Sequence, residues 1–185
     1  MAQDSKEQRI ADAVRRSKRQ LAVKILAVVV ILAALGYALF WYVNSRGANL
    51  PGVLYPEQGR EHKELGYQFT YNSNPPTSGP HYATAAEWGV YKEELPDQVL
   101  IHNLEHGGIW ISYKPDISEE TIRELERFYE EWGRKIIVTP RAQNEADIAV
   151  AAWGYLDTFS IAEYSKERIE KFIGAYRNKG PEFVP

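Results

Sequence analysis

Nineteen consecutive residues near the N-terminus carry no charge: positions 25–43 read ILAVVVILAALGYALFWYV. A helix needs about 20 such residues to cross the hydrocarbon core of a membrane. The segment is apolar on every face, whereas a helix on the surface of a globular domain would have a polar face. We therefore expect residues 25–43 to form a single transmembrane helix.

The charges on either side of this segment predict its orientation. Residues 1–24 hold seven Lys or Arg against three Asp or Glu, and the whole chain of 185 residues carries a net charge of −3, so the remainder is acidic. Basic residues that flank a span stay in the cytoplasm. We expect a cytoplasmic tail at 1–24, a single pass through the cytoplasmic membrane, and a C-terminal domain outside it. An acidic exported domain also indicates that the partner is not a nucleic acid.

A cleaved signal peptide is the alternative interpretation of the same segment. Its apolar region would be roughly 7–15 residues long and would precede a cleavage site with small residues. Here the run is longer and ends in Phe40, Trp41 and Tyr42, and such aromatic residues favour the membrane interface. The sequence therefore favours an uncleaved anchor.

The rest of the chain divides into residues 44–61, which are rich in Gly, Pro and polar residues and predict a linker, and an exported domain at 62–180. The domain is predicted to contain a strand at 109–113, a helix that starts at Ser118, a strand at 135–139, a strand within 146–159 and a helix at 165–176. This order predicts an α+β fold with two layers, in which helices cover a small mixed sheet.

Two segments of the domain have less regular patterns. Residues 67–81 begin like a short strand and continue as an extended loop, because three prolines exclude a regular helix. Residues 96–106 predict either a short helix ended by Gly107 and Gly108, or a strand or bent turn. Arg141, at the end of a predicted strand, could hold a carboxylate or phosphate, but it is expected to be solvated.

The four histidines are the main chemical signal, and all of them lie within 45 residues: His62, His81, His102 and His106. The chain has no cysteine, and its single methionine is the initiator. Thiolate zinc sites, iron–sulfur clusters and thioether copper sites are therefore excluded, and we expect neither haem nor a nucleotide. Imidazole nitrogens remain as ligands, and they suit Zn²⁺ or Cu²⁺.

His102 and His106 can share an ion only in certain backbone conformations. In a helix, residues four apart lie on one face, whereas in a strand they are about 13 Å apart. A joint site therefore requires a helix or a tight bend. Glu105, beside that face, is a further ligand or a general base for metal-bound water.

The other two histidines differ as candidates. His81 follows the rigid Gly79–Pro80 pair and is the natural third ligand. His62 is the weakest candidate, because its neighbours in GREHKE are polar and charged. The predicted metal ligands are thus His81, His102, Glu105 and His106.

The string HxxEH at 102–106 matches the signature of inverted zinc peptidases. That class requires a helix that continues well past the second histidine. Here Gly107 and Gly108 follow at once, so the sequence disfavours a peptidase.

Five short motifs carry a resemblance to a known family: NPPTSGPH at 74–81, WGVY at 88–91, HNLEHGG at 102–108, VTPR at 138–141 and AWG at 152–154. Together they resemble the DUF3105 family. The resemblance implies a bacterial protein with one N-terminal span and an exported domain, and it implies no activity. It places His81, His102, Glu105 and His106 within motif blocks and leaves His62 outside them.

Three functions follow as hypotheses. The first is a membrane-anchored domain that binds Zn²⁺ or Cu²⁺ through the histidines. The second is a metal-free module that docks an envelope protein or polymer and uses the histidines and Glu105 as a structural network. The third is a metal-dependent hydrolase with Glu105 as its base, so the sequence leaves open whether the protein is an enzyme.

Overall fold

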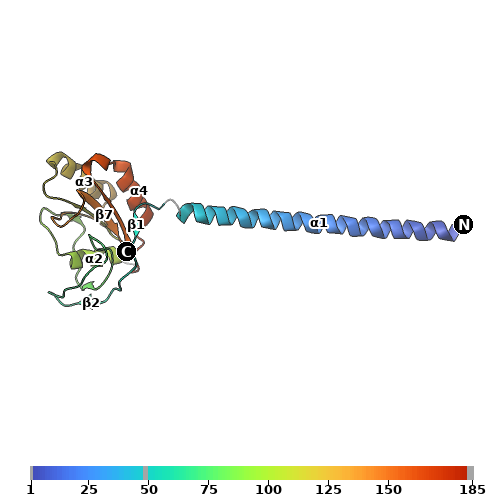
Figure 1. Cartoon of the computed structure of the whole chain (residues 1–185), viewed down its shortest axis with the longest axis horizontal. Helices are drawn as coiled ribbons and strands as arrows, with labels where there is room; N and C mark the ends of the chain where they lie inside the picture. The colour runs from blue at the N-terminus through green and yellow to red at the C-terminus, as the bar shows by residue number, and fades with distance from the viewer. Residues whose placement is uncertain (1, 48–49, 183–185) are drawn as a thin grey trace. The chain divides into compact units, whose positions relative to one another are not determined.

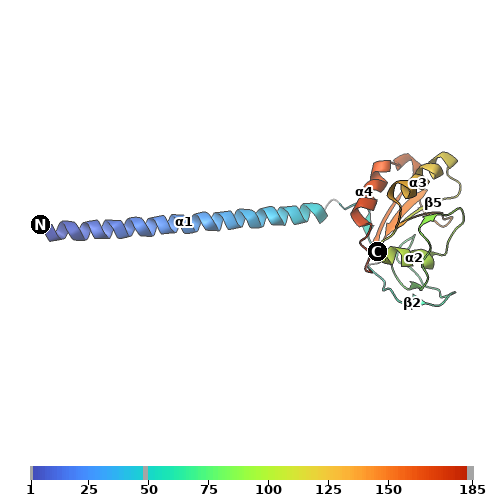
Figure 2. The ribbon, with the colours of Figure 1, turned by 180° about the vertical axis from the view of Figure 1, so that it is seen from behind.

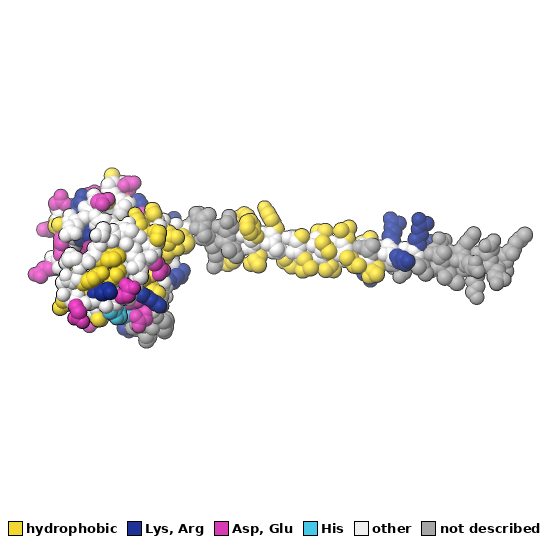
Figure 3. All heavy atoms as spheres, turned by 60° about the horizontal axis from the view of Figure 1, so that its bottom comes forward, with side chains coloured by type: hydrophobic (Ala, Val, Ile, Leu, Met, Phe, Trp, Pro, Cys, Tyr) yellow, Lys and Arg dark blue, Asp and Glu magenta, His cyan; other side chains and the backbone are white. Residues whose placement is uncertain are grey.

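The computed structural model describes residues 2–47 and 50–182, which form an N-terminal helix and a folded domain that begins at Leu50 (Figures 1 and 2). The helix, α1, runs over Ala2–Gly47. Within it, Lys18–Tyr42 is long and apolar enough to cross a membrane. Its large apolar side chains are exposed and form a continuous band, with Lys and Arg at one end (Figure 3). A membrane anchor and a signal sequence both have these properties, and the core helix of a soluble domain does not.

The folded domain is built on a mixed sheet of six strands in the order β1-β8-β7-β5-β6-β4. The neighbours β4, β6 and β5 are parallel, and the pairs β5–β7, β7–β8 and β8–β1 are antiparallel. The strands are β1 (Val53–Leu54), β4 (Gly89–Val90), β5 (Ile109–Tyr113), β6 (Ile136–Pro140), β7 (Ile148–Ala152) and β8 (Tyr155–Phe159). A second small sheet pairs β2 (His62–Lys63) with β3 (His81–Tyr82) in parallel.

The helices of the domain begin where the sequence predicts. They are α2 (Asp97–Glu105), α3 (Glu119–Trp132) and α4 (Lys166–Tyr176), with a short 3-10 helix at Ile161–Glu163. The side chains of Ser118 and Ser165 accept hydrogen bonds from backbone amides of the first turns of α3 and α4. Such caps satisfy amides that have no partner within the helix. For residues 96–106 the structure shows the helical alternative.

The sheet has helices on both faces, and the α+β class is confirmed. Ile111 and Val138 face a core with α3 and α4, whereas the intervening Trp110 and Ile137 face a second core with α2. The two expected layers are the sheet and the helices on its first face, α3 and α4. The opposite face of the sheet is covered by α2 and the N-terminal loops. The reason is that β5, β6 and β7 are buried at every position, so both faces require a cover.

The single strand expected within residues 146–159 is wrong in one respect, because two strands occur there. β7 and β8 form a hairpin in which Ala152 is opposite Tyr155. Trp153 and Gly154 make the connection, and Gly154 has φ of 75°, a conformation that glycine adopts without strain. The tight turn therefore lies at the centre of the run that we expected to be extended.

The N-terminal segment of the domain also differs from expectation in detail. Val53, in the stretch predicted as a linker, pairs with Leu156 and starts the edge strand β1. Residues 67–71, expected to open as a strand, have no regular structure. Residues 75–80 of the proline-rich loop after them are buried, and the hydroxyl of Tyr71 donates to the carbonyl of Pro80 at 2.6 Å. The loop is therefore held against the domain just before His81.

Candidate metal site

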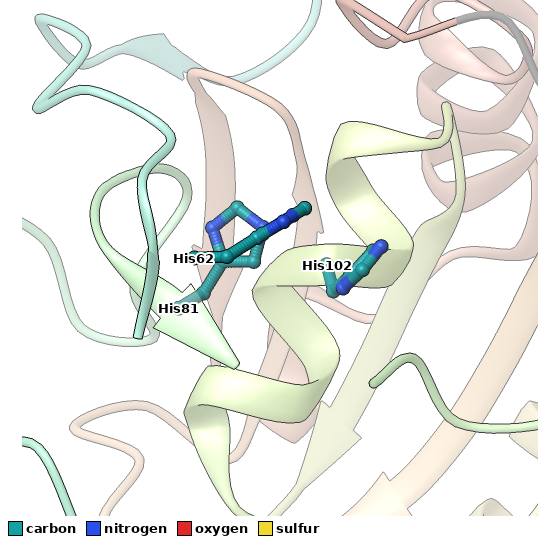
Figure 4. A group of neighbouring side chains, drawn as sticks. All are labelled: His62, His81 and His102. Atoms are coloured by element: carbon teal, nitrogen blue, oxygen red, sulfur yellow. The ribbon is translucent and has the colours of Figure 1, made fainter. Parts of the chain in front are cut away.

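Three histidines lie side by side on the face of the domain that carries α2: His62 on β2, His81 on β3 and His102 on α2 (Figure 4). Their ring centroids are 4.9–5.2 Å apart. The ring of His102 is also 4.4 Å from that of His106. All four histidines of the chain therefore belong to one cluster.

Strand pairing brings His62 to His81. In the parallel β2–β3 pair the two residues are direct neighbours, so their side chains lie next to each other. The amide of His81 donates to the carbonyl of Glu61, and the amide of Gly79 donates to that of Gly59, both at 3.0 Å. These bonds extend the contact between the two segments and fix their alignment.

The helix α2 supplies the remaining side chains. It ends at Glu105, where the amide of His106 bonds to the carbonyl of His102 and Gly107 takes a positive φ of 77°. Because the segment is helical, the Nε2 atoms of His102 and His106 approach to 3.0 Å. The helical backbone that a shared ion would require of His102 and His106 is thus present.

Both buried imidazoles are oriented by backbone carbonyls. Nδ1 of His81 is 2.8 Å from the carbonyl oxygen of Gly79, and Nδ1 of His102 is 2.8 Å from that of Tyr82. A carbonyl oxygen only accepts, so each Nδ1 carries a proton and donates. In the neutral ring the lone pair is then on Nε2. Metal-binding histidines show this pattern, in which the second nitrogen donates to a carbonyl or carboxylate.

Glu105 is a buried carboxylate inside the cluster, only 3% exposed. Its Oε2 is 3.1 Å from Nε2 of His81 and 3.5 Å from Nε2 of His62. Both ring nitrogens of His81 therefore face oxygen acceptors. Because Nδ1 carries the proton, the contact between Nε2 and Oε2 of Glu105 requires a cation between these two atoms. A proton or a metal ion meets that requirement. Burial lowers the pKa of His81, which disfavours the doubly protonated form of this ring.

His106 lies at the edge of the cluster. Its Nε2 is 3.4 Å from Oε2 of Glu182, near the C-terminus. Burial and the neighbouring His102 lower the pKa of His106. The side chain also lines a surface pocket of about 520 Å³, together with Trp88 and Asn103.

Two overlapping groups have ligand atoms close enough for one ion: His62, His81 and His102, and also His102, Glu105 and His106. Within each group these atoms lie within 4.8 Å of one another. Ligands about 2.0–2.1 Å from a tetrahedral zinc are roughly 3.3 Å apart, so modest side-chain movements would bring either group to coordination distance. The donor set of imidazoles and one carboxylate suits Zn²⁺ or Cu²⁺.

The structure brings together all four residues predicted as ligands and adds two others. His62 was the weakest sequence candidate and is indeed exposed over 47% of its side chain, yet it stands directly beside His81. Glu182 had no signal in the sequence, because its contact with His106 depends on where the C-terminal segment packs. Arg141, expected to be solvated, is buried and forms an ion pair with Asp97.

Fold and site together define an α+β domain that contains a histidine–carboxylate cluster and follows an apolar N-terminal helix. Residues 62–184 match the family described as a protein of unknown function, DUF3105, and the chain belongs to that family. The resemblance of the five motifs is thereby confirmed, and the match begins at His62. No curated protein and no solved structure matches the chain.

Proposed function

We propose that this protein is a membrane-anchored, extracytoplasmic domain that binds one Zn²⁺ or Cu²⁺ ion, with Nε2 of His62, His81 and His102 as ligands. One observation carries the proposal. The two buried rings are both tied through Nδ1 to backbone carbonyls, which leaves their Nε2 atoms as the available ligand atoms, and both rings belong to a group whose ligand atoms lie within 4.8 Å of one another. A core histidine that serves packing alone has no need of other possible ligand atoms so close to it.

Glu105 supplies the charge that a buried dication needs. An ion taken out of water into the domain is stable only where opposite charge or dipoles replace its hydration. The carboxylate lies within 3.5 Å of Nε2 in both His62 and His81. It acts either as the fourth ligand or as the partner that orients the imidazoles.

A route for the ion passes by His62, the half-exposed member of the group. Histidine side chains reach the surface of the domain beside acidic and basic residues (Figure 3). A site with three imidazoles and an open fourth position is also the arrangement of catalytic zinc centres. A hydrolase with Glu105 as base is therefore a second function that the same site supports.

The test uses the full-length chain in detergent micelles, stripped with chelator and titrated with Zn²⁺ or Cu²⁺. We expect one ion per chain by mass spectrometry and a rise in melting temperature. A ligand present at 100 times its Kd stabilises the folded state by about 2.7 kcal/mol. His62→Ala should keep the fold and lose affinity, because the side chain is half exposed, and Glu64→Gln on the exposed surface nearby is the control.

Absence of bound metal and of any thermal shift in the wild type would contradict the proposal. That result would favour the metal-free module, in which the histidines and Glu105 form a structural network beneath a docking surface for an envelope protein or polymer. Hydrolysis of ester, peptide or phosphate substrates by the loaded protein, lost in Glu105→Gln, would identify the hydrolase.

A further inference from the structure

His102 belongs to both ligand groups, and it has only one lone pair to offer. Its Nδ1 donates to the carbonyl of Tyr82, which leaves Nε2 as the single ligand atom. An imidazole in this state binds one ion at a time. When His102 holds an ion together with His62 and His81, it cannot also be a ligand in the group with Glu105 and His106. Equally, when it holds an ion in that second group, it is not available to His62 and His81.

The two groups reach solvent through different residues. The first opens at His62, which is half exposed. The second opens at His106, which lines the pocket of about 520 Å³ beside Trp88, and His62 is not among the residues that line this pocket. An ion in one position is thus accessible from a different part of the surface than an ion in the other.

Each group also has a carboxylate that holds its outer histidine when no ion is bound there. Oε2 of Glu105 is 3.5 Å from Nε2 of His62, and Oε2 of Glu182 is 3.4 Å from Nε2 of His106. The 3.0 Å contact between Nε2 of His102 and Nε2 of His106 fits a hydrogen bond in which His106 donates. Departure of the ion from either group therefore leaves its outer histidine, His62 or His106, with a partner.

We infer that the two groups are alternative positions of a single ion, which passes between the two openings by exchanging ligands around Nε2 of His102. This inference rests on the proposed metal binding and deepens it: the domain transfers an ion between a donor and an acceptor that approach different openings. His102 is the shared ligand, and His62 and His106 define the two ends.

The test titrates the full-length chain in micelles with Cu²⁺ and follows its electron paramagnetic resonance spectrum. Wild type is expected to bind one equivalent. His62→Ala and His106→Ala should each still bind one equivalent, with spectra that differ from each other because the ion is confined to opposite positions. His102→Ala should lose at least about tenfold in affinity for both positions. Glu182→Gln, which releases His106, should shift the wild-type spectrum towards that of His62→Ala.

Outcomes that overturn the inference differ from those that overturn metal binding. Two Cu²⁺ ions bound together in wild type would show that the positions do not compete. A spectrum and affinity of His106→Ala identical to wild type would remove the second position. In both cases metal binding by the histidine cluster stands, whereas a wild type that binds no Cu²⁺ contradicts metal binding itself. Circular dichroism of each variant checks that it is folded.

Discussion

His81 and Glu105 are 24 positions apart in the sequence, yet Nε2 of one lies 3.1 Å from Oε2 of the other inside the domain. The other ring nitrogen of His81 already donates to the carbonyl of Gly79. Two lone pairs would oppose each other at this contact if the ring were neutral and the carboxylate charged. A cation bound at the proposed metal site would relieve this repulsion.

Glu105→Gln tests this contact directly. The amide nitrogen of glutamine can donate to Nε2 of a neutral His81, so we expect the metal-free melting temperature to stay the same or rise. The affinity for Zn²⁺ should fall by at least about tenfold, because the negative charge next to the ion is gone. Calorimetric scans with and without Zn²⁺ measure both effects. A marked loss of metal-free stability would instead indicate a protonated His81 paired with the carboxylate.

Arg141→Ala tests the link between α2 and the loop that precedes His81. Its guanidinium bonds to Asp97 at 2.8 and 2.9 Å and to Asn74 at 2.6 Å. Removing one partner of a buried ion pair costs about 3–5 kcal/mol, and partial exposure of Asp97 places the expected loss near the lower end. Chemical denaturation measures it.

The matched control is Arg123→Ala on α3. Arg123 pairs with Glu119 on the exposed surface, and such pairs contribute at most about 1 kcal/mol. Equal losses in the two variants would show that the network around Arg141 does not hold the domain together.

Gly180→Ala tests the packing of the C-terminal segment on the end of α2. A Cβ at this position would lie 2.1 Å from the carbonyl oxygen of Glu105. The amide of Glu182 donates to that same carbonyl, and the amide of Asn178 donates to the carbonyl of Gly107. Loss of two such bonds should destabilise the fold by about 1–3 kcal/mol and speed hydrogen exchange at these amides.

Gly174→Ala is the control for this substitution. Gly174 lies within α4, and a Cβ there meets nothing within 4 Å. Alanine in the interior of a helix should stabilise by about 0.5–1 kcal/mol. Destabilisation by Gly174→Ala, or no effect of Gly180→Ala, would contradict the packing described for the two positions.

The double variant Val29→Arg/Val30→Arg tests the anchor. Each arginine near the centre of a span costs about 2.5–3.5 kcal/mol, so the protein should leave the membrane fraction of the cell. Val53→Arg, at an exposed position of β1, should leave membrane association unchanged. The intact mass of the wild-type protein extracted from membranes distinguishes the anchor from a signal sequence, since cleavage would remove the span.

Several elements could be predicted from the sequence because their causes are local. The uncharged run at 25–43 has the length of a span, and the caps Ser118 and Ser165 precede amphipathic helices. The short apolar run at 109–113, made mostly of β-branched and aromatic residues, marks a strand whichever partner it has. His102 and His106 are four apart on one short helix, so a helical assignment alone brings their rings together.

Other features depend on contacts between distant segments. The hairpin at Gly154 divides a run whose residue types suit one strand, and only the pairing of Ala152 with Tyr155 reveals the turn. The burial of Arg141 depends on Asp97, 44 positions earlier.

The sequence by itself thus determined the apolar N-terminal helix, the α+β class and four members of the candidate site. The tertiary structure decided that His62 joins His81, because the register of two short parallel strands is a relation between segments that neither segment encodes alone. It also decided that Glu105 points at His81 and that Glu182 meets His106. These contacts join parts of the chain that are remote in sequence, and packing of the whole domain determines them.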